Sequence, residues 1–314
     1  MTEPLVSIFL PTYNQEEFIA ESIESALNQS YDNIEIVIGD DHSQDSTWEI
    51  VQRYSQEYPQ QIVAFRNDEN LGITGNCNQV LKRCSGKYIA FHAGDDILLE
   101  EKVASQVAVL EQAASNVLCY HDVEVFNSET DETIRYWNSG EDGVNPVTGD
   151  SERVARQLIK RGTEFMAAQG VMVERAKIPD KGYDERVPVT SDWLLWVEVC
   201  ASHDGEVEYI DEPLVRYRKH NGGVTSNHDI NVADRYVVLA IVEERYPRYR
   251  TEVRQRRGYM YYREGVEAIQ QGKYKEGQAS LVQGAYYSPH SWKLLGWLLL
   301  ALVRAYTGSY PNES

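Results

Sequence analysis

Two adjacent aspartates, Asp95 and Asp96, are the residues of this sequence with the clearest capacity for chemistry. They follow the run KYIAFHAG, whose apolar residues are typical of a buried strand. Paired carboxylates supply the hard oxygen ligands of Mg²⁺ and Mn²⁺, ions usually held by one or two carboxylates together with substrate phosphates. The pair predicts a divalent metal site for a phosphorylated substrate. The competing interpretation is a solvated turn in which Asp96 caps the next helix.

Polar residues follow three other apolar runs in the same way. They are Thr12 to Asn14 after LVSIFL, Asp40 and Asp41 after IEIVI, and Asn67 to Thr74 after IVAFR. Ligands collect beyond the carboxyl ends of parallel strands, so four such loops predict one shared site. Neither a G-x-G-x-x-G fingerprint nor a P-loop is present, so the phosphate site is of another kind.

The elements that must position these loops alternate between strand and helix over the first 125 residues. Strands are predicted at 5–10, 34–40, 62–67, 87–96 and 117–125, and helices at 16–28, 45–56, 76–84 and 98–109. Further on we predict a loop over 128–150, helices at 153–161 and 191–201, and two short strands around Pro213. The pattern favours an open, mostly parallel α/β sheet flanked by helices, with a helical extension rich in Tyr and Arg after about residue 229.

The charge balance restricts the partners. Lys+Arg 30 against Asp+Glu 49 leaves a net charge of −19, which would repel a nucleic-acid backbone. An anionic nucleotide remains compatible, because a bound divalent cation reverses the local field. The four cysteines show no C-x-x-C spacing, and the N-terminus lacks a basic leader, so we expect a cytoplasmic protein.

The C-terminal region leaves two alternatives open. Residues 264–289 resemble one helical hairpin of the tetratricopeptide type, although a single hairpin is more typical of a helical cap. The apolar run Leu294–Val303 is too short to span a bilayer. The segment 291–306 is either buried or an interfacial helix that makes peripheral contact with the cytoplasmic face of a membrane.

The opening PLVSIFLPTYNQEEFIAESIESALNQSYDNIEIVIGDDHSQDST and the element HAGDDI resemble the family 2 inverting glycosyltransferases of the GT-A fold. The resemblance implies transfer from a nucleotide-sugar donor, UDP-linked in our interpretation, with Mn²⁺ or Mg²⁺ on the departing diphosphate. It implies Asp96 as the principal metal ligand, Asp95 as a ribose or metal contact, and Asp41 as the acceptor for a uracil-like base. It divides the chain into a nucleotide-sugar half (1–125), an acceptor and catalytic-base half (126–230), and a helical region (231–314).

Other candidate residues rest on the same resemblance. The nucleotide contacts it implies are Pro11, Thr12, Tyr13, Asn14, Glu16, Asn70, Gly72 and Asn76. Asp192 in TSDWLLWVE matches the family's catalytic base, although Ser191 stands where the family often has Glu; Ser-Asp here is also a helix-start signature. His220 in VRYRKHNGG is implied as a metal ligand, Arg218 as a diphosphate contact, and Trp193 as an acceptor-facing ring.

The acceptor is expected to be a hydroxyl of a glycan or of a lipid-linked glycan. A sugar nucleotidyltransferase is a rival interpretation, but such enzymes usually carry a basic, Gly-rich loop where this chain has PTYNQEE. A catalytically silent nucleotide-sugar-binding protein is a second rival. The retention of both Asp96 and Asp192 argues against it.

Overall fold

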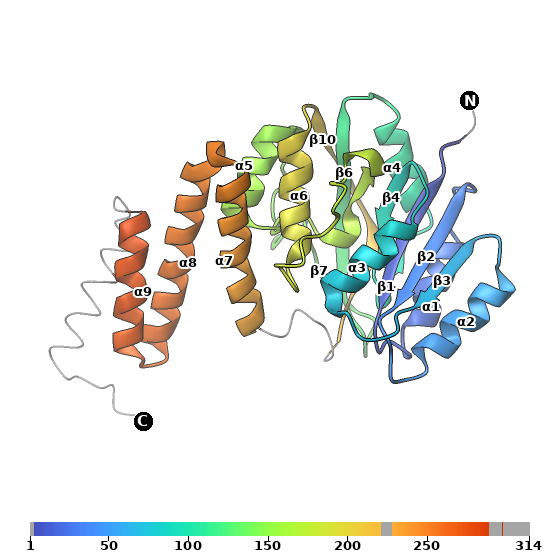
Figure 1. Cartoon of the computed structure of the whole chain (residues 1–314), viewed down its shortest axis with the longest axis horizontal. Helices are drawn as coiled ribbons and strands as arrows, with labels where there is room; N and C mark the ends of the chain where they lie inside the picture. The colour runs from blue at the N-terminus through green and yellow to red at the C-terminus, as the bar shows by residue number, and fades with distance from the viewer. Residues whose placement is uncertain (1–2, 221–227, 289–296, 298–314) are drawn as a thin grey trace. The chain divides into compact units, whose positions relative to one another are not determined.

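A computed structural model describes residues 3–220, 228–288 and 297 of the chain. The chain divides into two compact units, Met1–Val238 and Leu239–Ser314. The first holds a mixed α/β sheet and the second is helical (Figure 1). Among the helices of the described residues, none combines the length and apolarity needed to cross a bilayer.

Four parallel strands form the N-terminal half of the sheet. They are β1 (Val6–Thr12), β2 (Ile34–Asp40), β3 (Ile62–Arg66) and β4 (Tyr88–Phe91), joined by α1 (Ile19–Leu27), α2 (Thr47–Glu57) and α3 (Gly72–Arg83). Their order is β3-β2-β1-β4, with Thr12 paired to Asp40 at the carboxyl ends. The strand order reverses between β1 and β4, which is where open α/β sheets bind ligands.

The second half of the sheet is mixed. Its elements are β5 (Ile97–Leu98), α4 (Lys102–Leu110), β6 (Asn116–Asn127), β7 (Thr133–Tyr136), β8 (Gly149–Asp150), α5 (Ser151–Arg161), β9 (Met172–Glu174), α6 (Ser191–Ser202) and β10 (Glu206–Lys219). The short β9 pairs antiparallel with both β4 and β6, and β10 runs parallel to β6. β9 therefore joins the two halves into one sheet.

Alternation along the strands divides the core between two faces. Ile8 and Ile36 belong to a fully buried cluster that includes residues of α1, α2 and α4. On the other face the rings of Phe9 and Phe91 lie 5.0 Å apart, and Phe91 meets Trp196 of α6 edge-on at 4.8 Å. Apolar residues at both alternations are what a strand covered by helices on both faces requires.

Four details differ from the sequence-based expectation. The region 207–218 forms part of one 14-residue strand, β10, whose register shifts on either side of Pro213 absorb the proline without ending the strand. The stretch 128–150 contains β7 and β8 as well as loop. The strand predicted at 87–96 ends at Phe91, so both aspartates lie in a turn beyond it, and the helix predicted at 98–109 begins only at Lys102, after β5.

The helical unit contains a close-packed hairpin. Helix α7 (His228–Arg245) runs across the boundary between the units, and α8 (Arg250–Gln270) and α9 (Tyr274–Tyr287) follow. A Cβ on Gly265 would lie only 3.0 Å from the Gly277 carbonyl oxygen, so these glycines let α8 and α9 approach closely. The predicted helical hairpin is confirmed, while its classification as tetratricopeptide-like or as a cap stays open.

Candidate active site

The turn after β4 carries a buried carboxylate with one oxygen left over. Asp96 is 1% exposed, and its Oδ1 accepts a hydrogen bond of 2.9 Å from the Arg218 amide. Its Oδ2 is buried and has no hydrogen-bond partner among the described residues. Burial, and then the neighbouring charge of Asp95, raise the pKa of Asp96 well above its usual value. A buried unpaired carboxylate oxygen is costly unless a cation satisfies it.

The few ligands that the protein offers at this turn fit a cation that takes its other ligands from a bound substrate. Within the described part of the chain, no group of three or more His, Cys, Asp or Glu gathers into a complete metal site. His220 reaches this turn, but its Nε2 lies 3.1 Å from Asp95 Oδ2 and its ring lies 4.7 Å from Phe18. Mg²⁺ and Mn²⁺ sites of this kind take their remaining ligands from phosphates and water.

Arg218 supports the turn from β10. It is 8% exposed, its Nε donates to the Asp95 carbonyl at 2.8 Å, and its Nη2 pairs with Glu21 of α1. Its guanidinium also stacks over the Phe18 and Phe126 rings at 4.9 and 4.8 Å. These contacts fix the guanidinium beside Asp96.

Helix α1 supports the same turn through Ser22, which the sequence analysis missed. The buried Ser22 hydroxyl donates to the Ala93 carbonyl at 3.0 Å, and that carbonyl also accepts from the Asp96 amide at 3.2 Å. His92 Nε2 lies 2.7 Å from Ser22 Oγ. The Ser22 hydroxyl therefore links the His92 ring to the Ala93 carbonyl. Burial lowers the pKa of His92 to about 3, so the ring is neutral.

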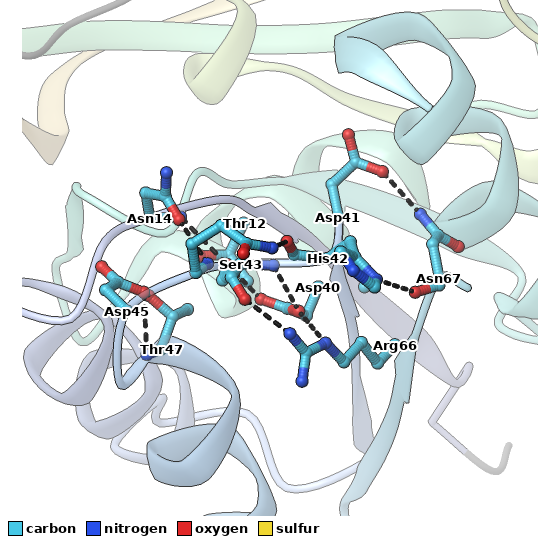
Figure 2. Close-up of polar contacts among 12 residues, drawn as sticks. Thr12, Asn14, Asp40, Asp41, His42, Ser43, Asp45, Thr47, Arg66 and Asn67 are labelled. Atoms are coloured by element: carbon cyan, nitrogen blue, oxygen red, sulfur yellow. Dashed lines mark hydrogen bonds and ion pairs between the residues drawn. The ribbon is translucent and has the colours of Figure 1, made fainter. Parts of the chain in front are cut away.

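The loops after β1 and β2 are cross-linked by reciprocal hydrogen bonds. Asn14, which adopts a positive φ of 50°, accepts from the Gln44 amide at 2.8 Å through Oδ1. Glu16 accepts from the Ser46 amide at 2.8 Å, and its own amide donates to Asp45 Oδ2 at 3.1 Å. Figure 2 shows Asn14, Ser43, Asp45 and Thr47 gathered at this junction. The side chains of Asn14 and Glu16 therefore link the loop after β1 to the loop after β2. Contact with a nucleotide would be a second role for these residues.

Asp41 is held in a fixed orientation. It is 3% exposed, and its Oδ1 accepts from Asn67 Nδ2 and from the Leu71 amide, both at 2.9 Å. Its amide donates to the Thr12 carbonyl at 3.0 Å, which ties the end of β2 to the end of β1. Figure 2 shows the Asp41 and Asn67 side chains turned towards each other. These hydrogen bonds hold the Asp41 carboxylate in place as an acceptor at this edge of the sheet.

Two further candidates around Asp41 also have structural partners. Asn76 is 3% exposed; its Oδ1 accepts from Asn67 at 3.0 Å and its Nδ2 donates to the Gly39 carbonyl at 2.9 Å. Asn70 Oδ1 accepts from the Gly72 amide at 3.1 Å, where Gly72 adopts a φ of +73°. Among the large apolar side chains at this edge, Tyr13, Leu71 and Ile73 are 43%, 40% and 37% exposed.

The turn after β4 packs directly against the loop after β1. A Cβ on Gly94 would lie 2.8 Å from Thr12 Oγ1 and 2.3 Å from Gln15 Oε1, so only glycine fits there without displacing its neighbours. Pro11 pairs with Gly39 within the sheet, next to Thr12. The Asp41 and Asp96 loops are therefore neighbours of one loop, at residues 12–15.

Helix α6 is attached to the same region through α3. Thr74 Oγ1 lies 2.7 Å from Ser191 Oγ and donates to the Val187 carbonyl at 2.6 Å. Asp192 follows in the first turn of α6, and burial raises its pKa to about 6. A carboxylate with a pKa near the working pH is suited to general-base catalysis.

Trp193 does not fit the acceptor-facing expectation. Its side chain is 3% exposed, and its indole N–H donates to the Leu158 carbonyl of α5 at 2.8 Å. A ring buried between helices offers no face for a sugar to stack on. Trp193 anchors α6 in the core of this structure, and its acceptor role stays a prediction.

Sequence comparison places the chain among known proteins. The sequence profile of glycosyl transferase family 2 matches residues 7–174. An uncharacterized Mycobacterium tuberculosis protein is 28% identical over 222 residues, covering 70% of this chain and 60% of the relative. The Escherichia coli UDP-Glc:alpha-D-GlcNAc-diphosphoundecaprenol beta-1,3-glucosyltransferase WfaP is 39% identical over 107 residues, covering 34% of this chain and 41% of WfaP. The chain thus spans 60% or less of the length of these relatives.

Solved structures share the fold. Staphylococcus aureus TarS 1–349 in complex with UDP-GlcNAc superimposes with a TM-score of 0.65 at 14% identity, covering 97% of this chain and 92% of the other. The Pyrobaculum calidifontis mannosyltransferase PcManGT in complex with GDP-Man and Mn²⁺ gives a TM-score of 0.58 at 15% identity, with 99% and 89% covered. The fold is that of GT-A glycosyltransferases, and because the family profile covers more than half of the sequence, the chain belongs to glycosyltransferase family 2.

Proposed function

We propose that this protein transfers a sugar from a UDP-linked donor to a hydroxyl of a glycan or lipid-linked acceptor, with inversion at the anomeric carbon. The observation that carries the proposal is the Oδ2 of buried Asp96, which has no partner among the described residues and lies in a turn packed against the same loop, residues 12–15, as Asp41. That oxygen would bind Mn²⁺ or Mg²⁺, and when bound the ion would stabilise negative charge on the departing diphosphate.

The chain's own groups fill the remaining roles. Asp41 would accept from the imide N–H of uracil, and the exposed Tyr13 ring would cover the base. Asp192 would take the proton of the acceptor hydroxyl as the bond to the anomeric carbon forms, since an inverting displacement needs a base on the face opposite the leaving group. Arg218 would add positive charge and hydrogen bonds beside the diphosphate, and His220 would complete the metal shell.

The comparisons support parts of this assignment. TarS is complexed with UDP-GlcNAc, and the name of WfaP includes a UDP-linked donor and a diphosphoundecaprenol-linked acceptor. PcManGT is complexed with GDP-Man and Mn²⁺, which supports a divalent cation but makes guanine the competing base.

A thermal-shift screen against UDP, GDP, dTDP and CDP sugars, each with and without Mn²⁺, tests donor and metal together. We expect the largest rise in melting temperature with a UDP-sugar plus Mn²⁺, because ligand binding stabilises the folded state by mass action. A rise in melting temperature with GDP-sugars alone would show that the donor carries guanine and not uracil. Equal shifts in EDTA and in Mn²⁺ would remove the metal from the proposal.

Substitution of the base tests the reaction itself. Asp192→Asn should lower kcat by about 10²- to 10⁴-fold and leave UDP affinity nearly unchanged. In the parent enzyme kcat should fall as pH drops below about 6, because protonated Asp192 cannot accept a proton. Turnover by Asp192→Asn equal to that of the parent would end the base assignment.

A further inference from the structure

The segment that leads into α6 is attached to α3 at two points. Asn78 Oδ1 accepts from the Tyr183 amide at 2.8 Å, and Asn78 Nδ2 donates to the Tyr183 carbonyl at 3.0 Å. Further along the segment, Thr74 Oγ1 donates to the Val187 carbonyl at 2.6 Å. Helix α3 therefore fixes the backbone of this segment on its way to the proposed catalytic base.

Helix α7 fixes the last two residues before α6. Asp234 Oδ2 accepts from the Val189 amide at 2.8 Å and from the Thr190 amide at 3.0 Å. Thr190 is the N-cap residue of α6, and its own side chain makes no capping hydrogen bond. The start of α6 is thus held by a carboxylate from another helix, whose negative charge also suits the N-terminal end of a helix dipole.

Asp234 lies on the buried face of α7. It is 4% exposed, and Val238, one helical turn further along, is 0% exposed. Burying a carboxylate is costly unless hydrogen bonds satisfy it, and the two backbone amides provide them. The side chain at position 234 therefore acts on the segment before α6, whereas an apolar residue there would only fill the core.

Asp192 comes two residues after Thr190, in the first turn of α6. The direction of its side chain depends on how that turn is placed and rotated. A general base must lie within hydrogen-bond reach of the proton that it removes, and a displacement of about 1 Å can cost on the order of 10²-fold in rate. Hydrogen bonds to the two residues before the turn limit such a displacement.

We infer that Asp234 is a positioning residue for the reaction: its carboxylate holds the backbone at Val189 and Thr190, and so keeps Asp192 in place for the acceptor hydroxyl. The inference rests on the proposed function, because it takes Asp192 as the base. It extends the candidate site to α7, which lies in the part of the chain where the sequence analysis expected a separate helical region.

Steady-state assays of the full chain test the inference. Asp234→Ala removes the acceptor for both amides and should lower kcat on the order of 10²-fold, with KM for the UDP-sugar unchanged. The pH at which kcat is half-maximal should also fall below the parent value of about 6, because a loosened first turn exposes Asp192 to water and weakens the burial that raises its pKa. Asp234→Asn keeps an oxygen that can accept from both amides, so it should restore most of the parent kcat.

Asp150→Ala is the matched control. Asp150 caps α5 in the same unit of the chain, where its side chain accepts from the Arg153 amide at 2.9 Å. Its loss should lower the melting temperature and leave both kcat and the pH dependence unchanged. The melting temperatures of all variants set an assay temperature at which each is folded. Asp234→Leu, which also lacks an acceptor, replaces Asp234→Ala if the alanine variant does not fold.

The contrary outcomes are distinct. Parent-like kcat and pH dependence in Asp234→Ala, with Asp192→Asn inactive, would overturn the inference and leave the base assignment standing. Parent-like turnover by Asp192→Asn would remove the base, and the inference with it. An equal fall in kcat in Asp234→Ala and Asp150→Ala would overturn the inference in favour of a general loss of stability. An equal fall in Asp234→Asn and Asp234→Ala would overturn it in favour of an effect of charge alone.

Discussion

Two parts of the candidate site are built on opposite principles. The loops after β1 and β2 satisfy their polar groups by exchanging hydrogen bonds, as Asn14 does with Gln44 and Glu16 with Ser46. The turn after β4 buries Asp96 and leaves its Oδ2 without a partner among the described residues. The first arrangement stabilises the apoprotein, and the second costs stability until something binds. Polar residues at a strand end can therefore be scaffold or ligand, and hydrogen-bond satisfaction separates the two.

The comparison predicts its largest effect for Asp96→Asn. Transfer should fall about 10³-fold, since the loss of several kcal/mol of charge stabilisation by a metal corresponds to that factor. The melting temperature of the metal-free variant should rise by about 2–4 °C, because a neutral amide removes a charge whose burial is unfavourable. Differential scanning calorimetry with and without Mn²⁺, beside steady-state assays, measures both.

The pH dependence of stability follows from the direction of the pKa shift of Asp96. Folding raises the pKa of Asp96, so the folded state holds its proton more tightly than the unfolded state. The metal-free protein should therefore lose stability as pH rises from the ordinary carboxyl value towards the raised one, and Mn²⁺ should restore stability most at the higher pH. A metal-free Asp96→Asn variant that melts below the parent at neutral pH would contradict the interpretation that the buried Asp96 carboxylate costs stability.

Asp45→Ala should do the opposite, harming stability and sparing catalysis. Asp45 accepts from the amides of Glu16 and Thr47 and from the Thr47 hydroxyl. Loss of these acceptors should cost about 1–3 kcal/mol of unfolding free energy, measured by urea denaturation. Asp32→Ala, at an exposed loop position, serves as the control. A tenfold fall in kcat without loss of stability would move Asp45 from the scaffold into the site.

Ser22→Ala tests whether the turn needs support from α1. Without the hydroxyl, the Ala93 carbonyl and His92 each lose a hydrogen-bond partner. Loss of such support around a metal site typically costs about 10- to 100-fold in metal affinity or activity. We expect the Mn²⁺ concentration for half-maximal activity to rise while KM for the nucleotide sugar stays constant, and Ser22→Thr to restore it. A general loss of stability with unchanged Mn²⁺ dependence would make Ser22 merely structural.

The sequence predicted the N-terminal half of the sheet because its signals are local. Each apolar run of β1 to β4 lies between turn residues and is followed by polar residues, so both the strands and the loops could be predicted from the sequence. The three-residue β9 was not predicted, since its place between β4 and β6 depends on pairing with distant strands. Pro213 suggested a strand end, but neighbouring β6 absorbs it through register shifts.

The candidate site was predictable by residue type and less so by role. Asp41, Asp96 and Asp192 could be named because they follow strands or open a helix within recognisable motifs. The bracing roles of Asn14 and Glu16 could not, because their partners lie 30 residues away in sequence. Ser22 carried no signal at all: it is one of two serines on α1, and only the fold brings it to the turn after β4.

The smallest expected effect is that of substituting Trp193. Because Trp193 lies on α6, it extends the distinction between scaffold and ligand-binding residues to a third part of the fold. Trp193→Phe keeps most of the buried ring volume but removes the indole N–H that bonds to the Leu158 carbonyl. The loss should cost about 1–2 kcal/mol of stability. KM for the acceptor should be unchanged, because a ring that is 3% exposed touches core rather than substrate. A rise in acceptor KM with normal stability would mean that α6 opens during the reaction and that burial in the resting fold is a poor guide to contact at this position.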